Sequence, residues 1–331
     1  MKNIPFSITQ KLSFCFPNMK IYSSNPVGGG DISRAVRLET SEGKFFLKYN
    51  SNNKFSDMFC AEKQGLELLY SAKSGLIIPK PIICESNNED SFILMEFIES
   101  NLPEKNFWIN FSSRLASLHK KTSAQFGLDF DNYMGSLKQS NKFHSDWVSF
   151  YIEERILIQF EMAVKNGFID SSIRKQFNSF CNKLSDLIPA EKPSLIHGDL
   201  WAGNYMSGTE GKAAIFDPAC YYGHRESDIA MTKLFGGFSN EFYDGYNEAY
   251  ALVPGWKNRT DIFNIYPLLI HVNIFGYSYV YDVIKILYRI KNYFFFSVII
   301  ILKLFSANFT GDLCRNQLFR SIILKAKSLI L

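Results

Sequence analysis

Three polar residues, Asp199, Asn204 and Asp217, stand where short apolar runs of the sequence end. Asn204 lies five residues after Asp199, and Asp217 follows eighteen residues after Asp199. Phosphoryl transfer requires a carboxylate that orients or deprotonates the attacking hydroxyl, together with oxygen ligands for Mg²⁺. Protein kinases meet this need with an aspartate, an asparagine five residues later and a second aspartate downstream. Each residue alone would be typical of a turn, but together they predict an ATP- and Mg²⁺-dependent kinase with Asp199 as base and Asn204 and Asp217 as metal ligands.

Two charged residues earlier in the chain could support such a reaction. Lys48 is a cation in the mostly apolar strand pattern KFFLKYN, and Glu62 lies on the apolar face of the helix that follows. A carboxylate on such a face needs a partner. Pairing with Lys48 would direct the ammonium group towards phosphates. The alternative is that both residues are separate surface charges.

The nucleotide could also contact a turn and a strand end. The turn VGGGDIS contains Gly28, Gly29 and Gly30, whose N–H groups could bind phosphates, although hairpins also use glycines routinely. Met95 and Glu96 end a later apolar strand, at the expected junction of two lobes where kinases hold adenine. These five residues are therefore candidate ATP-binding positions.

The elements around these residues predict an α+β, two-lobed, protein-kinase-like fold. Turn signals and β-rich runs alternate over 20–50, which predicts three antiparallel strands. A helix at about 56–73 follows, Pro79 and Pro81 prevent its continuation, and an apolar strand at 91–99 completes a small sheet-rich lobe.

Helical periodicity dominates the rest of the chain, with a loop over roughly 123–143. The predicted helices include 107–122, 146–166 and 171–187. In the strand-like and loop-like segment that interrupts them, His197 is expected to brace the loop by hydrogen bonding, with a proton shuttle as the alternative. We expect three regions: a nucleotide-binding lobe, a helical catalytic and substrate lobe, and an apolar extension, over 1–100, 101–290 and 291–331.

Composition narrows the functional classes. Of the 331 residues, 47% are apolar and 21% are charged, as is typical of globular proteins. The net charge of +4 is mild and the basic residues are dispersed, which argues against nucleic-acid binding. The six cysteines are far apart in the sequence, and we expect them to be buried in a reducing compartment. Because no signal-peptide pattern opens the sequence, we expect a cytoplasmic protein.

One apolar segment, YFFFSVIIILKLF at 293–305, raises the question of membrane contact. As a helix, these residues would rise only about 20 Å, whereas a hydrocarbon core is ~30 Å thick. The length therefore favours a buried helix over a membrane-associated one.

Taken together, these residues resemble the fructosamine kinase family, also called ketosamine-3-kinases. HGDLWAGN (197–204) is similar to the family's HGDLW-small-GN motif, in which Trp201 is the distinguishing residue. Longer stretches match as blocks: FDPACYYGHRESDIAMTKLFGGF (216–238), FGLDFDNYMGSL (126–137) and DWVSFYIEERI (146–156). The resemblance covers about residues 20–288, and the last two blocks are similar to bacterial members.

The resemblance implies ATP-dependent phosphorylation of ketosamines, which are sugar adducts of amines and protein lysines, at the third hydroxyl of the sugar. The phosphorylated adduct then decomposes, so such enzymes promote deglycation. Trp201, His224 and Glu226 become candidate substrate contacts, and Asp228 is expected to anchor the catalytic loop through backbone hydrogen bonds. Some members carry a redox-sensitive cysteine in the glycine-rich loop, where this chain has Asp31, so no disulfide switch is expected there.

Two alternative functions remain open from the sequence. The first is a kinase for another small alcohol, such as an aminoglycoside or choline, for which we find no cluster of acidic residues in the helical lobe. The second is a non-catalytic interaction protein on the same fold, against which the complete set of kinase residues argues. The predicted partner is a small ketosamine or a glycated protein, and no nucleic acid.

Overall fold

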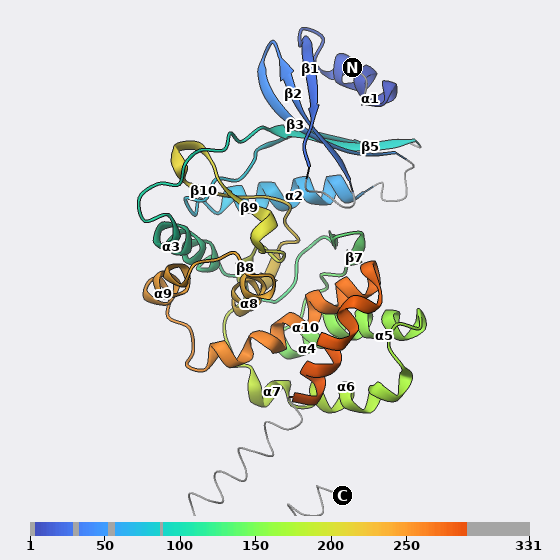
Figure 1. The fold of residues 1–331 in the computed structure, drawn as a ribbon, viewed down its shortest axis with the longest axis vertical. Coiled ribbons are helices and arrows are strands. Elements are labelled where there is room, and N and C mark those ends of the chain that lie inside the picture. The colour runs from blue at the N-terminus through green and yellow to red at the C-terminus, as the bar shows by residue number, and fades with distance from the viewer. Residues whose placement is uncertain (1–3, 29–32, 52–56, 87–88, 290–331) are drawn as a thin grey trace, which may run out of the picture.

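The computed structural model describes residues 4–28, 33–51, 57–86 and 89–289, and these form two lobes. A sheet-rich lobe lies at the top of Figure 1 and a larger, mainly helical lobe lies below it. The α+β, two-lobed architecture is thereby confirmed. Gly29, Gly30 and the predicted extension at 291–331, with its apolar segment at 293–305, lie outside the described residues.

The N-terminal lobe contains one antiparallel sheet with strands in the order β1-β2-β3-β5-β4 and two helices. Its elements are α1 (Phe6–Cys15), β1 (Ile21–Pro26), β2 (Arg34–Thr40), β3 (Gly43–Ser51), α2 (Met58–Ser71), β4 (Pro81–Ser86) and β5 (Asp90–Glu96). The three strands predicted over 20–50 and the helix predicted at about 56–73 are confirmed. The strand predicted to reach residue 99 ends at Glu96 instead. Strand β4 was not predicted; it tolerates Pro81 because this is the first residue of an edge strand.

Alternation along the strands gives this sheet two different faces. Leu47 and Tyr49 of β3 belong to a buried cluster with α1, a helix that the sequence patterns did not reveal. Ile93 and Met95 of β5 belong to the cluster on the other side, which includes α2. Lys48 alternates with Leu47 and Tyr49, so β3 directs its ammonium group to the α2 side.

Within the described residues the helical lobe is built from eight labelled α-helices, a further helical stretch at 280–289 and short hairpins. Its helices are α3 (Phe107–His119), α4 (Trp147–Tyr151), α5 (Leu157–Lys165), α6 (Arg174–Cys181), α7 (Leu184–Leu187), α8 (Glu226–Leu234), α9 (Asn240–Ala249) and α10 (Trp256–Phe275). Its strands are β6 (Asn132–Met134), β7 (Leu137–Gln139), β8 (Ser194–Ile196), β9 (Tyr205–Ser207), β10 (Ala213–Ile215) and β11 (Tyr221–Gly223). No helix in the described ranges is long and apolar enough to cross a membrane.

The helix predicted at 107–122 is confirmed, although it ends at His119. The other two predicted helices are each divided into shorter elements. The stretch 146–166 is α4, a π-helical turn at Ile152–Ile156 and α5 in succession. The stretch 171–187 is divided between α6 and α7. The predicted loop at 123–143 contains the β6–β7 hairpin, whose strands of three residues are too short to show an alternating pattern.

Helix α10 crosses the core of the helical lobe and contains Pro267. A proline has no N–H to donate to the carbonyl four residues earlier, which here belongs to Phe263. The buried hydroxyl of Tyr151 donates to that carbonyl at 3.0 Å and to the carbonyl of Ile262 at 2.8 Å. This compensation lets α10 continue to Phe275, at the edge of the space between the lobes.

The fold corrects one expectation about the cysteines. Cys60 on α2 and Cys84 on β4 are distant in the sequence, but their Sγ atoms lie 2.6 Å apart. Both side chains are partly buried, whereas Cys220 is fully buried as expected. Spacing in the sequence could not show this contact because it forms between a helix and an edge strand.

Candidate active site

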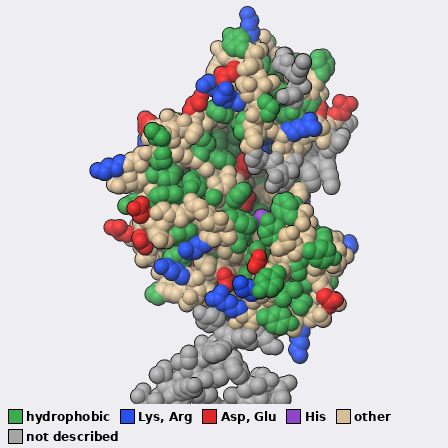
Figure 2. Space-filling model, in the orientation of Figure 1, with side chains coloured by type: hydrophobic (Ala, Val, Ile, Leu, Met, Phe, Trp, Pro, Cys, Tyr) green, Lys and Arg blue, Asp and Glu red, His purple; other side chains and the backbone are tan. Residues whose placement is uncertain are grey.

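A cavity of about 760 Å³ lies between the lobes, a size that suits a small-molecule ligand. Figure 2 shows the hollow on one face of the molecule, with acidic side chains and a histidine visible inside it. The predicted site residues that line it are Gly28, Lys48, Glu62, Met95, Glu96, Asp199, Trp201, Asn204 and Asp217. The fold therefore brings together nucleotide-side and catalytic candidates from both lobes.

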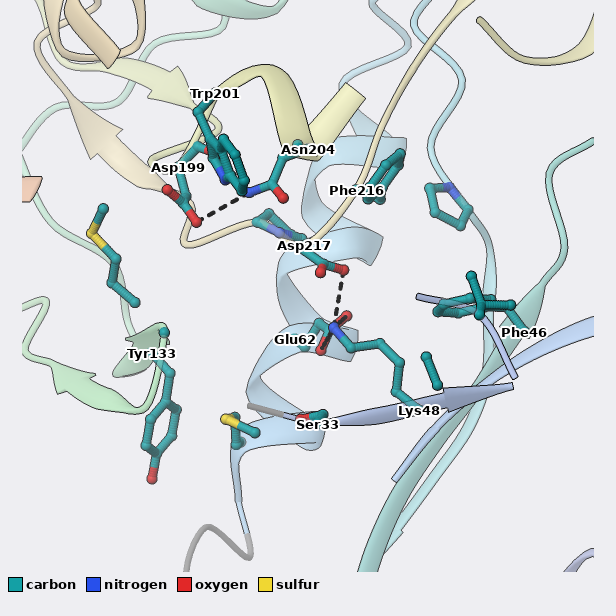
Figure 3. A pocket seen from close by; sticks show the side chains of 18 of the residues that line it. Ser33, Phe46, Lys48, Glu62, Tyr133, Asp199, Trp201, Asn204, Phe216 and Asp217 are labelled. Atoms are coloured by element: carbon teal, nitrogen blue, oxygen red, sulfur yellow. Dashed lines mark hydrogen bonds and ion pairs between the residues drawn. The ribbon is translucent and has the colours of Figure 1, made fainter. Parts of the chain in front are cut away.

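Lys48 joins the two lobes electrostatically. Its Nζ lies 2.9 and 3.0 Å from the two carboxylate oxygens of Glu62 and 2.9 Å from Oδ1 of Asp217. Figure 3 shows the three side chains converging from β3, from α2 and from the loop after β10. Burial opposes the charge on Lys48, but the two carboxylates outweigh burial and raise the pKa of the ammonium group above its ordinary value. The predicted pairing of Lys48 with Glu62 is confirmed.

Asp199 lies on the loop after β8 and lines the cavity beside Asn204 and Trp201 (Figure 3). The Asn204 amide nitrogen donates to the Asp199 carboxylate at 3.1 Å and to its backbone carbonyl at 2.8 Å. Burial, and then the negative charge of Asp217, raises the pKa of Asp199 to about 7. Its carboxylate is therefore placed to accept a proton near neutral pH.

Asp228 of α8 holds the loop that carries Asp199 through hydrogen bonds to its backbone. Its buried carboxylate accepts backbone N–H bonds from His197 at 2.7 Å and Gly198 at 2.9 Å, and contacts His119 Nε2 at 3.1 Å. Burial opposes ionisation, but these hydrogen bonds keep the pKa of Asp228 below its ordinary value. The anchoring role expected for Asp228 is confirmed.

His197 braces the same loop, as predicted. Its Nε2 lies 3.0 Å from the Phe216 carbonyl, and its Nδ1 accepts the N–H of Asp199 at 3.3 Å. Burial lowers the pKa of His197, so the neutral ring with a proton on Nε2 fits both contacts. Because both ring nitrogens are engaged, the shuttle alternative has no support in this geometry.

Close backbone packing shapes the two loops. A Cβ on Gly198, whose φ is +83°, would lie 2.1 Å from the Ala219 carbonyl oxygen, and a Cβ on Gly203 would lie 2.3 Å from the Trp201 ring. Asp217 itself has a φ of +56°, a strained value for a residue with a side chain. This conformation occurs at the residue whose carboxylate meets Lys48, which is consistent with a functional constraint.

Asn204 and Asp217 are suitable residues for holding Mg²⁺. Only Oδ1 of Asp217 contacts Lys48, and Asn204 uses its amide nitrogen towards Asp199. The second carboxylate oxygen of Asp217 and the amide oxygen of Asn204 are hard donors of the kind that Mg²⁺ prefers. The donor set therefore fits the predicted metal, and both residues remain its predicted ligands.

The cavity also has an aromatic wall, of which the sequence analysis identified Trp201 alone. We define this wall as Trp201, Phe235, His271, Phe275 and Tyr279. The ring of His271 lies 5.1 Å from Phe235 and 4.8 Å from Tyr279, and Trp201 meets Phe235 edge to face at 5.8 Å. These residues come from the catalytic loop, the end of α8, α10 and the segment after it, so no local pattern could have linked them.

The β6–β7 hairpin closes another side of the cavity and was also missed. Tyr133 lines the cavity, and its hydroxyl donates to Asp57 at the start of α2, at 2.5 Å. Arg155, fully buried in the π-helical turn, donates to Asn141 Oδ1 at 2.6 Å and packs on Tyr221 at 4.0 Å. This buried arginine supports the segment after the hairpin and so connects the block at 146–156 to the site.

His224 and Glu226, predicted as substrate contacts, lie outside the cavity. His224 is fully buried, and its Nε2 lies 3.1 Å from the Pro189 carbonyl. Glu226 forms a buried, two-point ion pair with Arg259, at 2.8 and 2.6 Å. These residues begin α8 and hold it against its neighbours, which explains their place beside Asp228 in the sequence without substrate contact.

Comparison with known proteins identifies the chain. A model of the family described as fructosamine kinase matches residues 7–292. The chain belongs to the fructosamine kinase family. A probable ketoamine kinase of Enterococcus faecium is 38% identical over 256 residues, which cover 77% of this chain and 90% of that protein. The chloroplastic protein-ribulosamine 3-kinase of Oryza sativa subsp. indica is 37% identical, with 78% and 76% covered.

Solved structures agree with this family assignment. A Thermobifida fusca protein described as a fructosamine-3-kinase superposes with a TM-score of 0.75 and 29% identity, covering 85% of this chain and 97% of that one. The aminoglycoside phosphotransferase APH(2")-IIa, solved with streptomycin and ATP, has a TM-score of 0.60 at 13% identity, covering 87% and 97%. The second likeness shows the protein-kinase-like fold alone. This fructosamine kinase is a phosphotransferase that acts on an alcohol group.

Proposed function

We propose that this fructosamine kinase uses Mg²⁺-ATP to phosphorylate the third sugar hydroxyl of ketosamines, either free or on protein lysines, and so promotes deglycation in the cytoplasm. The observation that carries the proposal is the position of Asp199. Its carboxylate, with a pKa of about 7, lies in one cavity with the Lys48 ammonium and the aromatic wall. A phosphate-binding cation and a surface for a sugar derivative thus share the cavity with a base.

Each residue of the site has a role in this reaction. Lys48, held by Glu62 and Asp217, presents positive charge to phosphate oxygens, and Gly28, Met95 and Glu96 border the nucleotide side of the cavity. Asn204 and Asp217 would hold Mg²⁺, which when bound neutralises charge on the phosphates. Asp199 accepts the proton of the attacking hydroxyl and orients that hydroxyl for in-line transfer. Asn204 also keeps the Asp199 carboxylate in position.

The aromatic wall supports a sugar derivative as the acceptor. Trp201 offers a flat apolar surface that suits the C–H groups of a sugar chain or ring. In His271, Nδ1 lies 2.7 Å from the Pro267 carbonyl and burial lowers its pKa. A neutral ring that donates from Nδ1 leaves Nε2 as an acceptor for a hydroxyl. Polar groups matched in this way discriminate strongly against analogues that lack the hydroxyl.

The cavity offers less support for a polycationic substrate such as an aminoglycoside. The carboxylates that line it among the described residues are Glu62, Glu96, Asp199 and Asp217. Lys48 is paired with both Glu62 and Asp217 and offsets one of their two negative charges, while Asp217 is also assigned to Mg²⁺ and Asp199 is assigned as the base. Little negative charge therefore remains to bind several ammonium groups at once.

A substrate panel tests the proposal. ADP release by the full chain should be measured with fructosyl-lysine, ribulosyl-lysine, free fructose, choline and an aminoglycoside at equal concentration. We expect both ketosamines to react at least about tenfold faster than the others, with a modest preference between them because they differ by one hydroxymethyl group. The proposal is wrong if choline or the aminoglycoside reacts faster than either ketosamine.

A further inference from the structure

Two cysteines outside the active site touch where α2 meets the edge of the sheet. Cys60 is in the first turn of α2, two residues before Glu62, and Cys84 is in the middle of β4. Their Sγ atoms are 2.6 Å apart, whereas a disulfide has an S–S distance of about 2.05 Å. Only a small movement would therefore bring the two sulfurs to bonding distance.

We propose that Cys60 and Cys84 form a reversible disulfide that fastens α2 to the sheet. A low-molecular-weight disulfide, such as oxidised glutathione, is the oxidant. One cysteine thiolate attacks it and releases the first glutathione thiolate, and the second cysteine thiolate then attacks the mixed disulfide and releases the second. The two cysteines lose two protons and two electrons, and one oxidised glutathione becomes two reduced molecules.

The position of the pair determines what the bond would do. Among the described residues, strand β4 is at the edge of the sheet and pairs with β5 alone, while α2 packs on both strands. The same helix carries Glu62, which holds Lys48. The sulfurs touch while the Lys48–Glu62 ion pair is formed, so the disulfide is compatible with the arrangement that binds phosphate. Oxidation should therefore stabilise the lobe and preserve turnover.

The surroundings of the pair slow the exchange at neutral pH. Burial, followed by the contact with Cys60, raises the pKa of Cys84 to about 12, with Lys63 opposing this shift and Glu85 adding to it. Few molecules carry a Cys84 thiolate at neutral pH, so exchange is slow there. At equilibrium, closeness in the folded chain still favours the intramolecular bond over a mixed disulfide.

The test is a glutathione redox titration of the full chain to equilibrium at pH 8, followed by acid quenching, alkylation and peptide mapping. We expect one cross-linked peptide pair containing Cys60 and Cys84, and loss of two of the six cysteine thiols present in the chain. The bond closes a separation of 24 residues, so Tm should rise by roughly 5 °C or more. ADP release with a ketosamine should change less than about twofold.

Three variants separate this bond from other oxidation. Cys60→Ser and Cys84→Ser should each lose the rise in Tm, whereas the matched control Cys181→Ser, in the helical lobe, should keep it. Full alkylation of both Cys60 and Cys84 across the titration, or a rise in Tm that persists in Cys84→Ser, would overturn the proposal. Peptide mapping of the unsubstituted chain requires no variant to fold, and neither peptide mapping nor the Tm measurement requires the proposed substrate to be correct.

Discussion

Replacing Asp199 with asparagine should stabilise the ligand-free protein at pH 8 while removing its activity. The pKa of Asp199 is raised from 3.8 to about 7, mainly by burial and then by the charge of Asp217. A carboxylate with a higher pKa in the folded chain binds more protons there than in the unfolded chain. The free energy of unfolding therefore falls as the pH rises from about 4 to 7, and the loss is complete above the folded pKa.

The size of the pKa shift of Asp199 sets an upper limit on the change in the free energy of unfolding. A change of about three pKa units corresponds to about 4 kcal/mol. The side chain of Asp199 is partly exposed to solvent. Solvent screening therefore reduces the expected change in the free energy of unfolding to about 1–2 kcal/mol. Asparagine has a similar shape and retains an oxygen that can accept the amide N–H of Asn204, but it cannot ionise. The Asp199→Asn variant therefore avoids the cost of the buried charge.

Thermal unfolding without nucleotide or metal, from pH 5 to pH 8, measures the effect. The Tm of Asp199→Asn minus that of the unsubstituted protein should grow between pH 5 and 7 and reach roughly 1–3 °C at pH 8. Asp244→Asn, on the exposed face of α9, is the control and should show no such trend. A difference in Tm that stays constant across this pH range would refute the raised pKa. In the kinase assay, kcat of Asp199→Asn should fall by about 10²–10⁴-fold.

Three further substitutions test other parts of the site. Lys48→Ala should raise KM for ATP by about tenfold or more, because its ammonium group is the cation held towards the phosphates; an unchanged KM would contradict this role. Asp217→Asn should remove most of the Mg²⁺ dependence of ATP binding, since an amide is a weaker ligand for a hard cation, and titration of ATP with and without Mg²⁺ decides this. Asp228→Asn should cost about 1.5–3 kcal/mol, because a buried charged acceptor of two backbone N–H groups is lost, and a Tm equal to that of the unsubstituted protein would exclude its anchoring role.

The parts of the site that could be predicted from the sequence depend on short, local patterns. Lys48 stood out because strand alternation separates it from apolar neighbours, and Glu62 because it interrupts the apolar face of a helix. Asp199 and Asn204 lie on a single loop, so the number of residues between them is fixed and can be recognised in the sequence. Each pattern indicates the conformation of one helix, strand or loop. Which residues then meet across the cavity is determined by how these elements pack together.

The parts that could not be predicted depend on contacts between distant segments. His271 lies in an apolar stretch of α10 and gives no sign in the sequence that it faces a cavity. Tyr133 looks like any turn residue until its hydroxyl meets Asp57 at the start of α2. His224 and Glu226 illustrate the opposite error, because polar residues beside a catalytic motif were assigned to substrate when their role is to hold a buried helix.

The structure also explains why the tryptophan and the glycines of HGDLWAGN occur together. The indole ring of Trp201 occupies the space that a Cβ on Gly203 would need, 2.3 Å away. Asn204 follows directly, and its amide group must reach back to Asp199. A side chain at position 203 would push against the ring that forms part of the aromatic wall and against the turn that positions Asn204. Trp201 is thus packed on the loop that holds Asn204 and Asp199, so the aromatic wall and the position of these two residues cannot vary independently at this point.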